Sequence, residues 1–450
     1  MKRLILPIIL LGLTLTAMAD ADLTSARIYR NQGELVKADH FFSLAIEKSP
    51  DLYVAYFERG EMYGMIATDR TKKGVMRDIV GEIDDPQYAM LEKMLADFNV
   101  IRNIEDEKVR GKQKNLKKIE NIIESYWTDF YNESVDADVK HVEKLAVIDS
   151  LKDAGDTLRA PEGSEEPTTF DKAIADAKRL QESVIHSCDI CILLKPDEWN
   201  PFALKAQVLD RVGKTGQANV IWEKALMALD ASDLKEKEKP KYTEAWRIIQ
   251  LHRLQNYYNA DNYEKTIEVS NEIIAVCLEE GFSSSALESM SEEDAGEAQH
   301  CKDAYVFKAF AIISEVHAAD STADMSALRN TAIGALKDAH AASPDDSAIP
   351  FYLGQFYLEE GDTTKTLEWW KLYTQLDPED YEVLFQIGYI YLEGGTYIDY
   401  AKSETIYQEL VDRHPDQCTG WINLGVSQIK QDKTKIGAEN VKKGEECSKQ

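Results

Sequence analysis

The chain has 450 residues, of which 44% are hydrophobic and 29% are charged, so it has enough apolar side chains to bury a large core and is not disordered throughout. Its 80 Asp and Glu residues outnumber its 52 Lys and Arg residues, which gives a formal net charge of −28 at pH 7. Such a charge repels the phosphates of nucleic acids and anionic lipid headgroups, so we expect no nucleic-acid partner.

The N-terminus has the three parts of a secretory signal peptide. Lys2 and Arg3 are followed by an apolar run over residues 4–16, and Ala17-Met18-Ala19 matches a small-x-small cleavage site. The run is shorter than the roughly 20 residues that a membrane-spanning helix needs. We therefore expect residues 1–19 to be a signal peptide cleaved after Ala19, a periplasmic or secreted location, and no transmembrane segment in the mature chain.

The next region, residues 20–107, has helical periodicity that is interrupted at about residues 67–87. Arg70 and Arg77 lie in this interruption together with two lysines and a glycine. The composition predicts a loop or a short helix there.

Residues 108–168 predict an inserted helical hairpin followed by a linker. Apolar residues at helical spacing predict one helix over 112–131 and a second over 135–158. The inner face of the second helix is expected to consist of Val139, Val142, Leu145, Ala146 and Ile148. The stretch 160–169, rich in Pro, Gly, Ser and Glu, is the clearest domain boundary.

A dense basic cluster lies at the start of this insertion. It consists of Lys108, Arg110, Lys112, Lys114, Lys117 and Lys118. The cluster either docks an anionic polymer or an acidic partner, or it is the solvated start of a helix whose charge is opposed by neighbouring acidic residues. We favour the second interpretation.

The C-terminal part of the chain repeats with a period of 34 residues. Four pairs share this interval: Pro344 and Pro378, Gly354 and Gly388, Tyr357 and Tyr391, Gly361 and Gly395. Between the glycines, apolar residues recur at i, i+3, i+4 and i+7, which predicts helices. Each unit is therefore expected to be two helices joined by a Gly-containing turn, with a core supplied by stacking.

These units resemble tetratricopeptide repeats, whose pattern is W-x-x-L-G-x-x-Y, then A-x-x-x-F, then Pro. One unit matches this pattern at Leu353, Gly354, Tyr357, Trp370 and Pro378. Partial matches occur at Tyr29, Gly33, Ala38, Phe42, Ala45 and Pro50, at Tyr56, Gly60 and Tyr63, at Ala218, Trp222 and Ala225, and at Trp421, Leu424 and Gly425.

The resemblance implies an all-α fold, an α-solenoid of stacked helical hairpins interrupted by the inserted hairpin. Repeat-like units are expected over residues 20–107 and 169–450. Within the second region, weaker units are expected at 169–196, 242–279 and 303–343. A small residue such as Gly354 would let the two helices of a unit approach closely, while aromatic side chains fill the space between units.

Signatures of catalysis are missing from the sequence. Gly213-Lys214-Thr215 ends like a phosphate-binding loop, but Val208 stands where the first glycine is needed. Cys188 and Cys191 share one helix face, and His186 is rotated away from it, so the three do not form a set of metal ligands. We interpret the two cysteines as structural thiols or a structural bridge, and we expect no cofactor, no metal and no enzymatic activity.

The resemblance implies a non-catalytic exported scaffold that binds a protein or peptide through the concave face of the solenoid. Two alternatives stay open. One is a cryptic envelope enzyme, either a hydrolase or a thiol oxidoreductase, and the other is a purely structural part of a surface complex.

The expected binding face lies on the first helices of the three C-terminal units. Its residues are Phe351, Gln355 and Leu358, then Phe385, Tyr389 and Leu392, then Ile422, Val426 and Ile429. An aromatic and aliphatic stripe of this kind suits an apolar or amphipathic peptide. The alternative is that neighbouring helices cover the stripe.

Two disulfide bridges are expected from the placement of cysteines at helix ends. An antiparallel hairpin brings Cys418, before one predicted helix, close to Cys447, at the end of the next. Cys277 and Cys301 stand in a similar relation across a Ser- and Glu-rich loop. Of the 15 connectivities that six cysteines permit, this argument selects 418 with 447 and 277 with 301.

Overall fold

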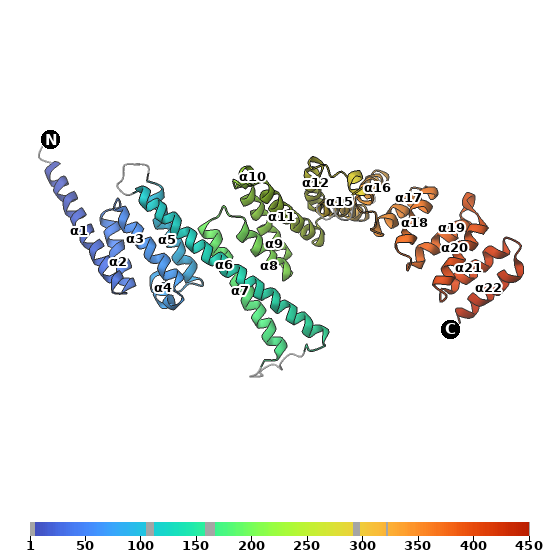
Figure 1. Ribbon diagram of the computed structural model, residues 1–450, viewed down its shortest axis with the longest axis horizontal. Coiled ribbons are helices and arrows are strands. Elements are labelled where there is room, and N and C mark those ends of the chain that lie inside the picture. Colours follow the sequence, from blue (N-terminus) through green and yellow to red (C-terminus); the bar gives the residue numbers. More distant parts are fainter. Residues whose placement is uncertain (1–4, 105–111, 158–166, 291–297, 321–322, 450) are drawn as a thin grey trace. The chain divides into compact units, whose positions relative to one another are not determined.

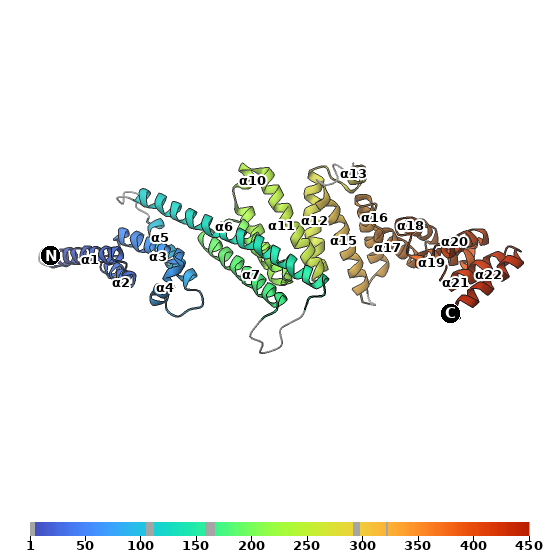
Figure 2. The ribbon, with the colours of Figure 1, turned by 60° about the horizontal axis from the view of Figure 1, so that its bottom comes forward.

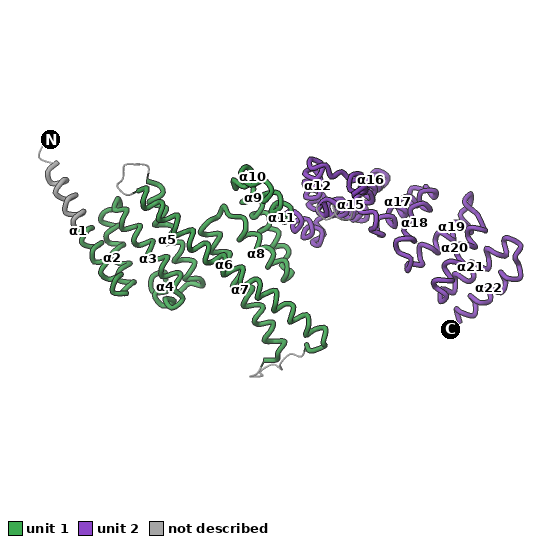
Figure 3. Tube along the Cα trace, in the orientation of Figure 1, with its two compact units in different colours: residues 1–249 green, residues 250–450 purple. Residues whose placement is uncertain are grey.

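A computed structural model describes residues 5–104, 112–157, 167–290, 298–320 and 323–449. Within these ranges every regular element is an α-helix or a 3-10 helix, which confirms the all-α prediction (Figure 1). The chain divides into two compact units, Met1–Ile249 and Gln250–Gln450 (Figure 3). Each unit is built from stacked helical hairpins.

The first unit contains the N-terminal hairpins and a pair of long helices. Its helices are α1 (Ile5–Asn31), α2 (Leu35–Lys48), α3 (Tyr53–Thr68), η1 (Arg70–Lys72), α4 (Lys73–Val80), α5 (Pro86–Arg102), α6 (Lys112–Asp153), α7 (Thr169–Leu194), α8 (Asn200–Arg211), α9 (Thr215–Ala231) and α10 (Leu234–Lys237). The next helix, α11 (Lys239–Asn259), runs through the boundary between the units. The pairs α1 with α2, α3 with α5, and α8 with α9 pack as hairpins.

The second unit contains the region with the 34-residue period. Its helices are α12 (Tyr263–Glu279), α13 (Ser284–Glu288), α15 (Gln299–Ala318), α16 (Met325–Ala342), α17 (Ala348–Glu359), α18 (Thr363–Leu376), α19 (Tyr381–Glu393), η2 (Gly395–Tyr397), α20 (Tyr400–Arg413), α21 (Cys418–Ile429) and α22 (Thr434–Cys447). The last three hairpins are α17 with α18, α19 with α20, and α21 with α22.

The insertion differs from the expected pair of helices. Residues 112–153 form the single helix α6, which packs along α7, and the two lie side by side in both views (Figures 1 and 2). The residues between the two predicted helices include no proline or glycine, and Ser134 Oγ donates a hydrogen bond to the Tyr131 carbonyl within the helix, 2.6 Å away. Nothing therefore breaks the helix there. The hairpin is made by α6 and α7, and residues 169–196, expected as a weak repeat unit, contain one helix.

The buried face of α6 also differs from the expected one in its C-terminal half. Val139 is 55% exposed and Val142 is exposed as well, whereas Ser134 and His141 are buried. The apolar pattern was misleading because two polar residues occupy positions in the buried face. Burial lowers the pKa of His141, and the nearby Arg211 guanidinium lowers it further.

The helices of a repeat hairpin approach closely because a glycine faces a large side chain. A Cβ atom at Gly354 would lie 2.2 Å from Trp370 Cδ1, and one at Gly388 would lie 2.8 Å from Tyr407 Cζ. In the first unit Gly60 faces Phe98 in the same way. The close approach at the glycine matches the prediction, but the large side chains pack against the glycine inside a hairpin, whereas the sequence predicted that they would lie between units.

The turn between the two helices of a hairpin repeats as well. Gly361 adopts a positive φ of 78° after α17, and the Asp362 side chain then accepts a hydrogen bond from the Lys365 backbone amide at the start of α18. In the last hairpin Asp432, with φ 63°, takes the place of the glycine. In both hairpins a residue with a left-handed backbone conformation follows the first helix. In the α17–α18 hairpin an aspartate also caps the N-terminus of the second helix.

Lysines flank the repeated tyrosine of two successive units. Lys337 and Lys365 lie 5.6 and 4.8 Å from the centre of the Tyr357 ring. Lys371 and Lys402 each lie 5.4 Å from the centre of the Tyr391 ring. Because each tyrosine contacts a lysine from the preceding unit and one from its own second helix, these contacts connect neighbouring hairpins.

No helix in the described part of the chain is long and apolar enough to cross a membrane.

Replacing Gly354 by Ala tests the close approach of the paired helices. The added methyl group would overlap the Trp370 ring, so we expect Gly354→Ala to lower the free energy of unfolding by about 1–3 kcal/mol. The matched control is Gly334→Ala on α16, where a Cβ atom meets nothing within 4 Å. That change should be neutral or stabilise the protein by up to about 1 kcal/mol. Urea unfolding followed by circular dichroism measures both, and equal effects would contradict the packing argument.

Candidate peptide-binding face

The expected binding face lies on α17, α19 and α21, the first helices of the three C-terminal hairpins. We refer to its nine residues as the stripe; they are Phe351, Gln355, Leu358, Phe385, Tyr389, Leu392, Ile422, Val426 and Ile429. Equivalent residues of the three helices form three columns, and these columns differ in how far their side chains are buried.

The first column, Phe351, Phe385 and Ile422, lies against the second helix of each hairpin. The Phe351 and Tyr373 ring centres are 5.4 Å apart, and those of Phe385 and Tyr407 are 5.6 Å apart. Ile422 packs over Gly444 of α22. These side chains are partly buried, so a ligand could contact only part of each one.

The second column contains Gln355, Tyr389 and Val426. Tyr389 is 46% exposed, while the other two are partly buried. The Tyr389 hydroxyl donates a hydrogen bond to Glu393 Oε2 over 3.0 Å, and this bond raises the pKa of Tyr389. Tyr389 is therefore a neutral, accessible aromatic ring near the middle of the stripe.

The third column is interrupted at its middle position. Leu358 is 43% exposed and Ile429 is 39% exposed, but Leu392 is only 5% exposed. Leu392 belongs to a core cluster with Leu384, Tyr407, Leu410 and Leu424. A ligand cannot contact Leu392 while this cluster is intact, so the accessible part of the stripe centres on Leu358, Tyr389 and Ile429.

The three helices that carry the stripe have no Lys or Arg. Their charged residues are Glu359, Glu382 and Glu393. Glu359 is paired with Arg329 of α16, whose Nε lies 2.8 Å from Glu359 Oε2. Arg329 offsets the charge of Glu359, so Glu382 and Glu393 give this apolar surface its acidic character, which favours an apolar segment flanked by positive charge.

A polar network among α20, α21 and the turn that follows α21 was not anticipated from the sequence. Glu404 accepts hydrogen bonds from Gln428, Gln431 and Lys433, and Ser403 Oγ lies 2.8 Å from Ser427 Oγ. Burial acts to raise the Glu404 pKa, but the three donors outweigh it and lower the pKa. The network ties the last two hairpins together, and no apolar periodicity could have revealed it.

Cys188 and Cys191 are buried thiols of α7 and are not bridged. Burial raises the pKa of Cys188 to about 12 and raises that of Cys191 as well. His186 lies away from them, with Nδ1 3.0 Å from Asp85 Oδ2 and Nε2 3.0 Å from Gln87 Oε1. Because the thiolate is the reactive form, these groups are poorly suited to thiol–disulfide chemistry.

A separate cavity of about 380 Å³ lies beside α4, in the interruption of the N-terminal repeats. Arg70, Lys73 and Arg77 line it together with Asp84 and Asp85. Arg70 forms an ion pair with Glu133, and Arg77 Nε lies 3.6 Å from Glu82 Oε2. With these acidic residues beside its basic ones, the cavity has no clear preference for an anion.

The basic cluster at the start of α6 is partly involved in packing. Lys112 Nζ donates a hydrogen bond to the Ile104 carbonyl over 2.6 Å, and Lys118 Nζ lies 5.3 Å from the centre of the Phe57 ring. Lys108 and Arg110 lie outside the described residues. These contacts agree with the start of a helix rather than a surface reserved for an anionic polymer.

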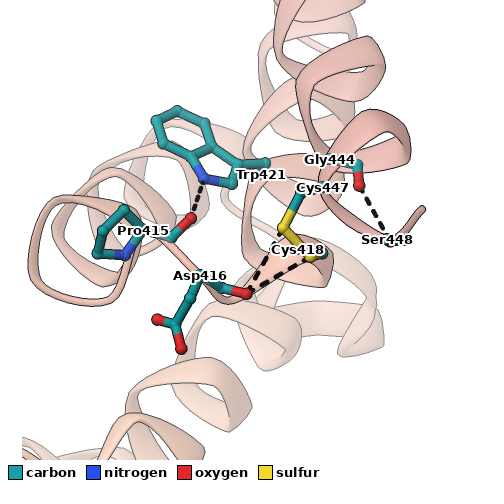
Figure 4. Close-up of a disulfide and its surroundings, with 7 residues drawn as sticks. All are labelled: Pro415, Asp416, Cys418, Trp421, Gly444, Cys447 and Ser448. Atoms are coloured by element: carbon teal, nitrogen blue, oxygen red, sulfur yellow. Dashed lines mark hydrogen bonds between the residues drawn. A yellow bond between two sulfur atoms is a disulfide. The ribbon is translucent and has the colours of Figure 1, made fainter. Parts of the chain in front are cut away.

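The structure contains both expected disulfide bridges, Cys277–Cys301 and Cys418–Cys447. The second joins the start of α21 to the end of α22 (Figure 4). Beside it, Trp421 Nε1 donates a hydrogen bond to the Pro415 carbonyl over 2.9 Å. The bridge and this bond hold the last hairpin, which lacks a following hairpin among the described residues.

Removal of the terminal bridge should loosen the last hairpin selectively. The two cysteines are 29 residues apart, so the chain-entropy model gives a loss of about 3–4 kcal/mol for Cys418→Ala with Cys447→Ala. Amide hydrogen exchange should accelerate in α21 and α22 and stay unchanged in α17 and α18, which serve as the internal control. Unchanged exchange in α21 and α22 would show that packing alone holds this hairpin.

Comparison with known proteins agrees with the repeat seen in the structure. A tetratricopeptide repeat model matches residues 382–416, which contain most of α19 and all of α20. This match identifies a tetratricopeptide repeat in the chain and confirms the resemblance inferred from the 34-residue period. No curated protein matches the sequence.

Solved structures of tetratricopeptide repeat proteins align with part of the chain. MamA aligns with 10% identity and a TM-score of 0.31, over 45% of this chain and 92% of MamA. YrrB, described as a TPR protein with an unusual peptide-binding site, aligns with 11% identity and a TM-score of 0.22, over 58% of this chain and 93% of YrrB.

A thermophilic TPR protein of Thermus thermophilus, TTC0263, aligns with 12% identity and a TM-score of 0.27, over 51% of this chain and 99% of its own. Since all three TM-scores are below 0.5, these alignments carry no inference about a ligand.

Proposed function

We propose that the chain is an exported, non-catalytic scaffold that binds a peptide segment of a protein partner through the accessible part of the stripe on α17, α19 and α21. The observation that carries this proposal is the exposure of Leu358, Tyr389 and Ile429 on successive repeat helices. Large apolar side chains that are exposed on successive helices of one kind can each contact an extended or helical ligand.

The charge around the stripe limits the kind of peptide. The three helices carry Glu359, Glu382 and Glu393 and no basic residue, and the whole chain has a net charge of −28. A peptide with apolar residues flanked by Lys or Arg complements this surface, whereas an acidic tail would be repelled. The proposed ligand is therefore an amphipathic, basic-flanked segment.

Substitutions at the exposed residues test the binding face. Partners are first captured from the envelope fraction by a photocrosslinker at position 389, and the crosslinked segment is then made as a synthetic peptide. We expect Leu358→Glu and Tyr389→Ala each to weaken binding of this peptide to the protein at least about tenfold. Each substitution removes apolar contact area from the accessible part of the stripe. Isothermal titration calorimetry measures the dissociation constants.

The matched control is Ile436→Glu on α22, which replaces an apolar side chain that is 50% exposed and outside the stripe. It should bind the peptide as the unchanged protein does. If Leu358→Glu and Tyr389→Ala bind normally while circular dichroism shows intact helices, the proposed face is wrong. Selective capture of acidic peptides would contradict the proposed charge of the ligand.

The arrangement of α1 is compatible with cleavage after Ala19, although Ala19 itself is buried. Cleavage after Ala19 would leave the contacts of the following residues in place, since Arg27 pairs with Glu58 over 2.6 Å and Lys48 with Asp22 over 2.6 Å. Leu23 and Ala26, also beyond the cleavage point, are buried. The two disulfide bridges fit an oxidising compartment.

Processing of the N-terminus is the direct test of export. We expect N-terminal sequencing of the protein purified from the envelope fraction to begin at Asp20, because Ala17-Met18-Ala19 supplies the cleavage pattern. Replacing Ala19 by a bulky residue, as in Ala19→Phe, should cause the uncleaved precursor to accumulate. Recovery of the chain with Met1 in the cytosolic fraction would contradict export.

A further inference from the structure

A histidine lies directly beside one of the two disulfide bridges. Cys277 is at the end of α12, and His300 and Cys301 are in the first turn of α15. The ligand atoms of these three residues all lie within 4.8 Å of one another, and all three residues are buried. His300 Nε2 is 3.3 Å from Cys301 Sγ.

Two sulfur atoms and one imidazole nitrogen this close together are a suitable ligand set for a thiophilic cation such as zinc. Zinc binds cysteine sulfur at about 2.3 Å and histidine nitrogen at about 2.0–2.1 Å, which places two sulfur ligands of a tetrahedral site about 3.8 Å apart. In the bridge the two sulfurs are bonded to each other, so binding the cation requires this bond to be broken and the sulfurs to move apart. His300 Nε2 lies 3.3 Å from Cys301 Sγ, close to the roughly 3.5 Å expected between a nitrogen and a sulfur ligand of one tetrahedral zinc ion.

We propose that, when the Cys277–Cys301 bridge is reduced, Cys277, His300 and Cys301 bind a zinc-like divalent cation. The oxidised bridge and the metal exclude each other because they use the same two sulfur atoms. Three protein ligands leave a fourth coordination position for water.

The bridge is first reduced, and the cation then binds. A dithiol reductant supplies two electrons and two protons, becomes a disulfide itself, and converts the bridge into two thiols. The cation then binds both sulfurs as thiolates together with neutral His300, and two protons are released to solvent. Metal binding is therefore expected to weaken as the pH falls.

The other bridge provides an internal comparison. Cys418 Sγ and Cys447 Sγ lie 3.4 and 3.5 Å from the Asp416 carbonyl oxygen. Among the described residues, the group at Cys277 is the one cluster of three or more His, Cys, Asp and Glu residues with metal-ligand proximity. Reduced Cys418 and Cys447 therefore supply two thiols without an imidazole.

Cobalt binding to full-length variants tests the proposal. All variants carry Cys188→Ala and Cys191→Ala, which removes the thiols of α7. The trio variant also carries Cys418→Ala and Cys447→Ala, and the terminal-pair variant carries Cys277→Ala and Cys301→Ala instead. A fourth protein adds His300→Ala to the trio variant. Each is reduced with a phosphine, freed of reductant and titrated with Co²⁺, and bound Co²⁺ is then displaced with Zn²⁺.

We expect the reduced trio variant to bind one Co²⁺ with a thiolate charge-transfer band, and the oxidised trio variant to show no such band. Loss of His300, or use of the terminal pair, should weaken Zn²⁺ binding at least about tenfold. The proposal is overturned if the reduced trio variant gives no band, if His300→Ala binds equally well, or if the terminal pair binds as tightly. Circular dichroism checks that each protein stays helical.

A second measurement covers the case in which a variant does not fold. The unchanged protein is reduced and then alkylated with and without Zn²⁺, and the modified cysteines are identified by peptide mapping. Zinc should protect Cys277 and Cys301 from alkylation at least about tenfold more than Cys418 and Cys447. Equal protection of the two pairs would reject the site.

Discussion

The close approach of two helices within each hairpin is the constraint on which the repeat region depends. It requires a position without a side chain on the first helix, which faces a large side chain at Gly354 with Trp370 and Gly388 with Tyr407 and faces the backbone of Gly437 at Gly425. A single hairpin cannot bury both of its faces, so the outer faces must pack against the next hairpin. The 34-residue period repeats this arrangement along the chain.

This constraint also decides which residues a ligand can reach. Once a first helix packs closely on its partner, side chains such as Phe351 and Phe385 contact that partner and are partly covered. Tyr389, one turn after Phe385, and Leu358, two turns after Phe351, keep more of their surface. The proposed binding face is therefore narrower than the apolar stripe in the sequence.

The two bridges stabilise the second unit in different chemical settings. One joins the start of α21 to the end of α22 in the last described hairpin. The other joins α12 to α15 in a buried setting beside His300. Both bridges close the chain covalently, but the proposed metal binding depends on the imidazole of His300, which lies beside Cys277–Cys301.

The sequence by itself determined the all-α class, the 34-residue hairpins, their turns and both disulfide pairs, because helical period, Gly position and helix-end cysteines are local properties. Only the tertiary structure decided that Val139 is exposed and His141 buried, and that Leu392 is in the core while Leu358 is accessible. Burial depends on which distant segment packs against a residue, and equivalent repeat positions meet different neighbours. The proximity of Cys277, His300 and Cys301 likewise needed α12 and α15 to pack together.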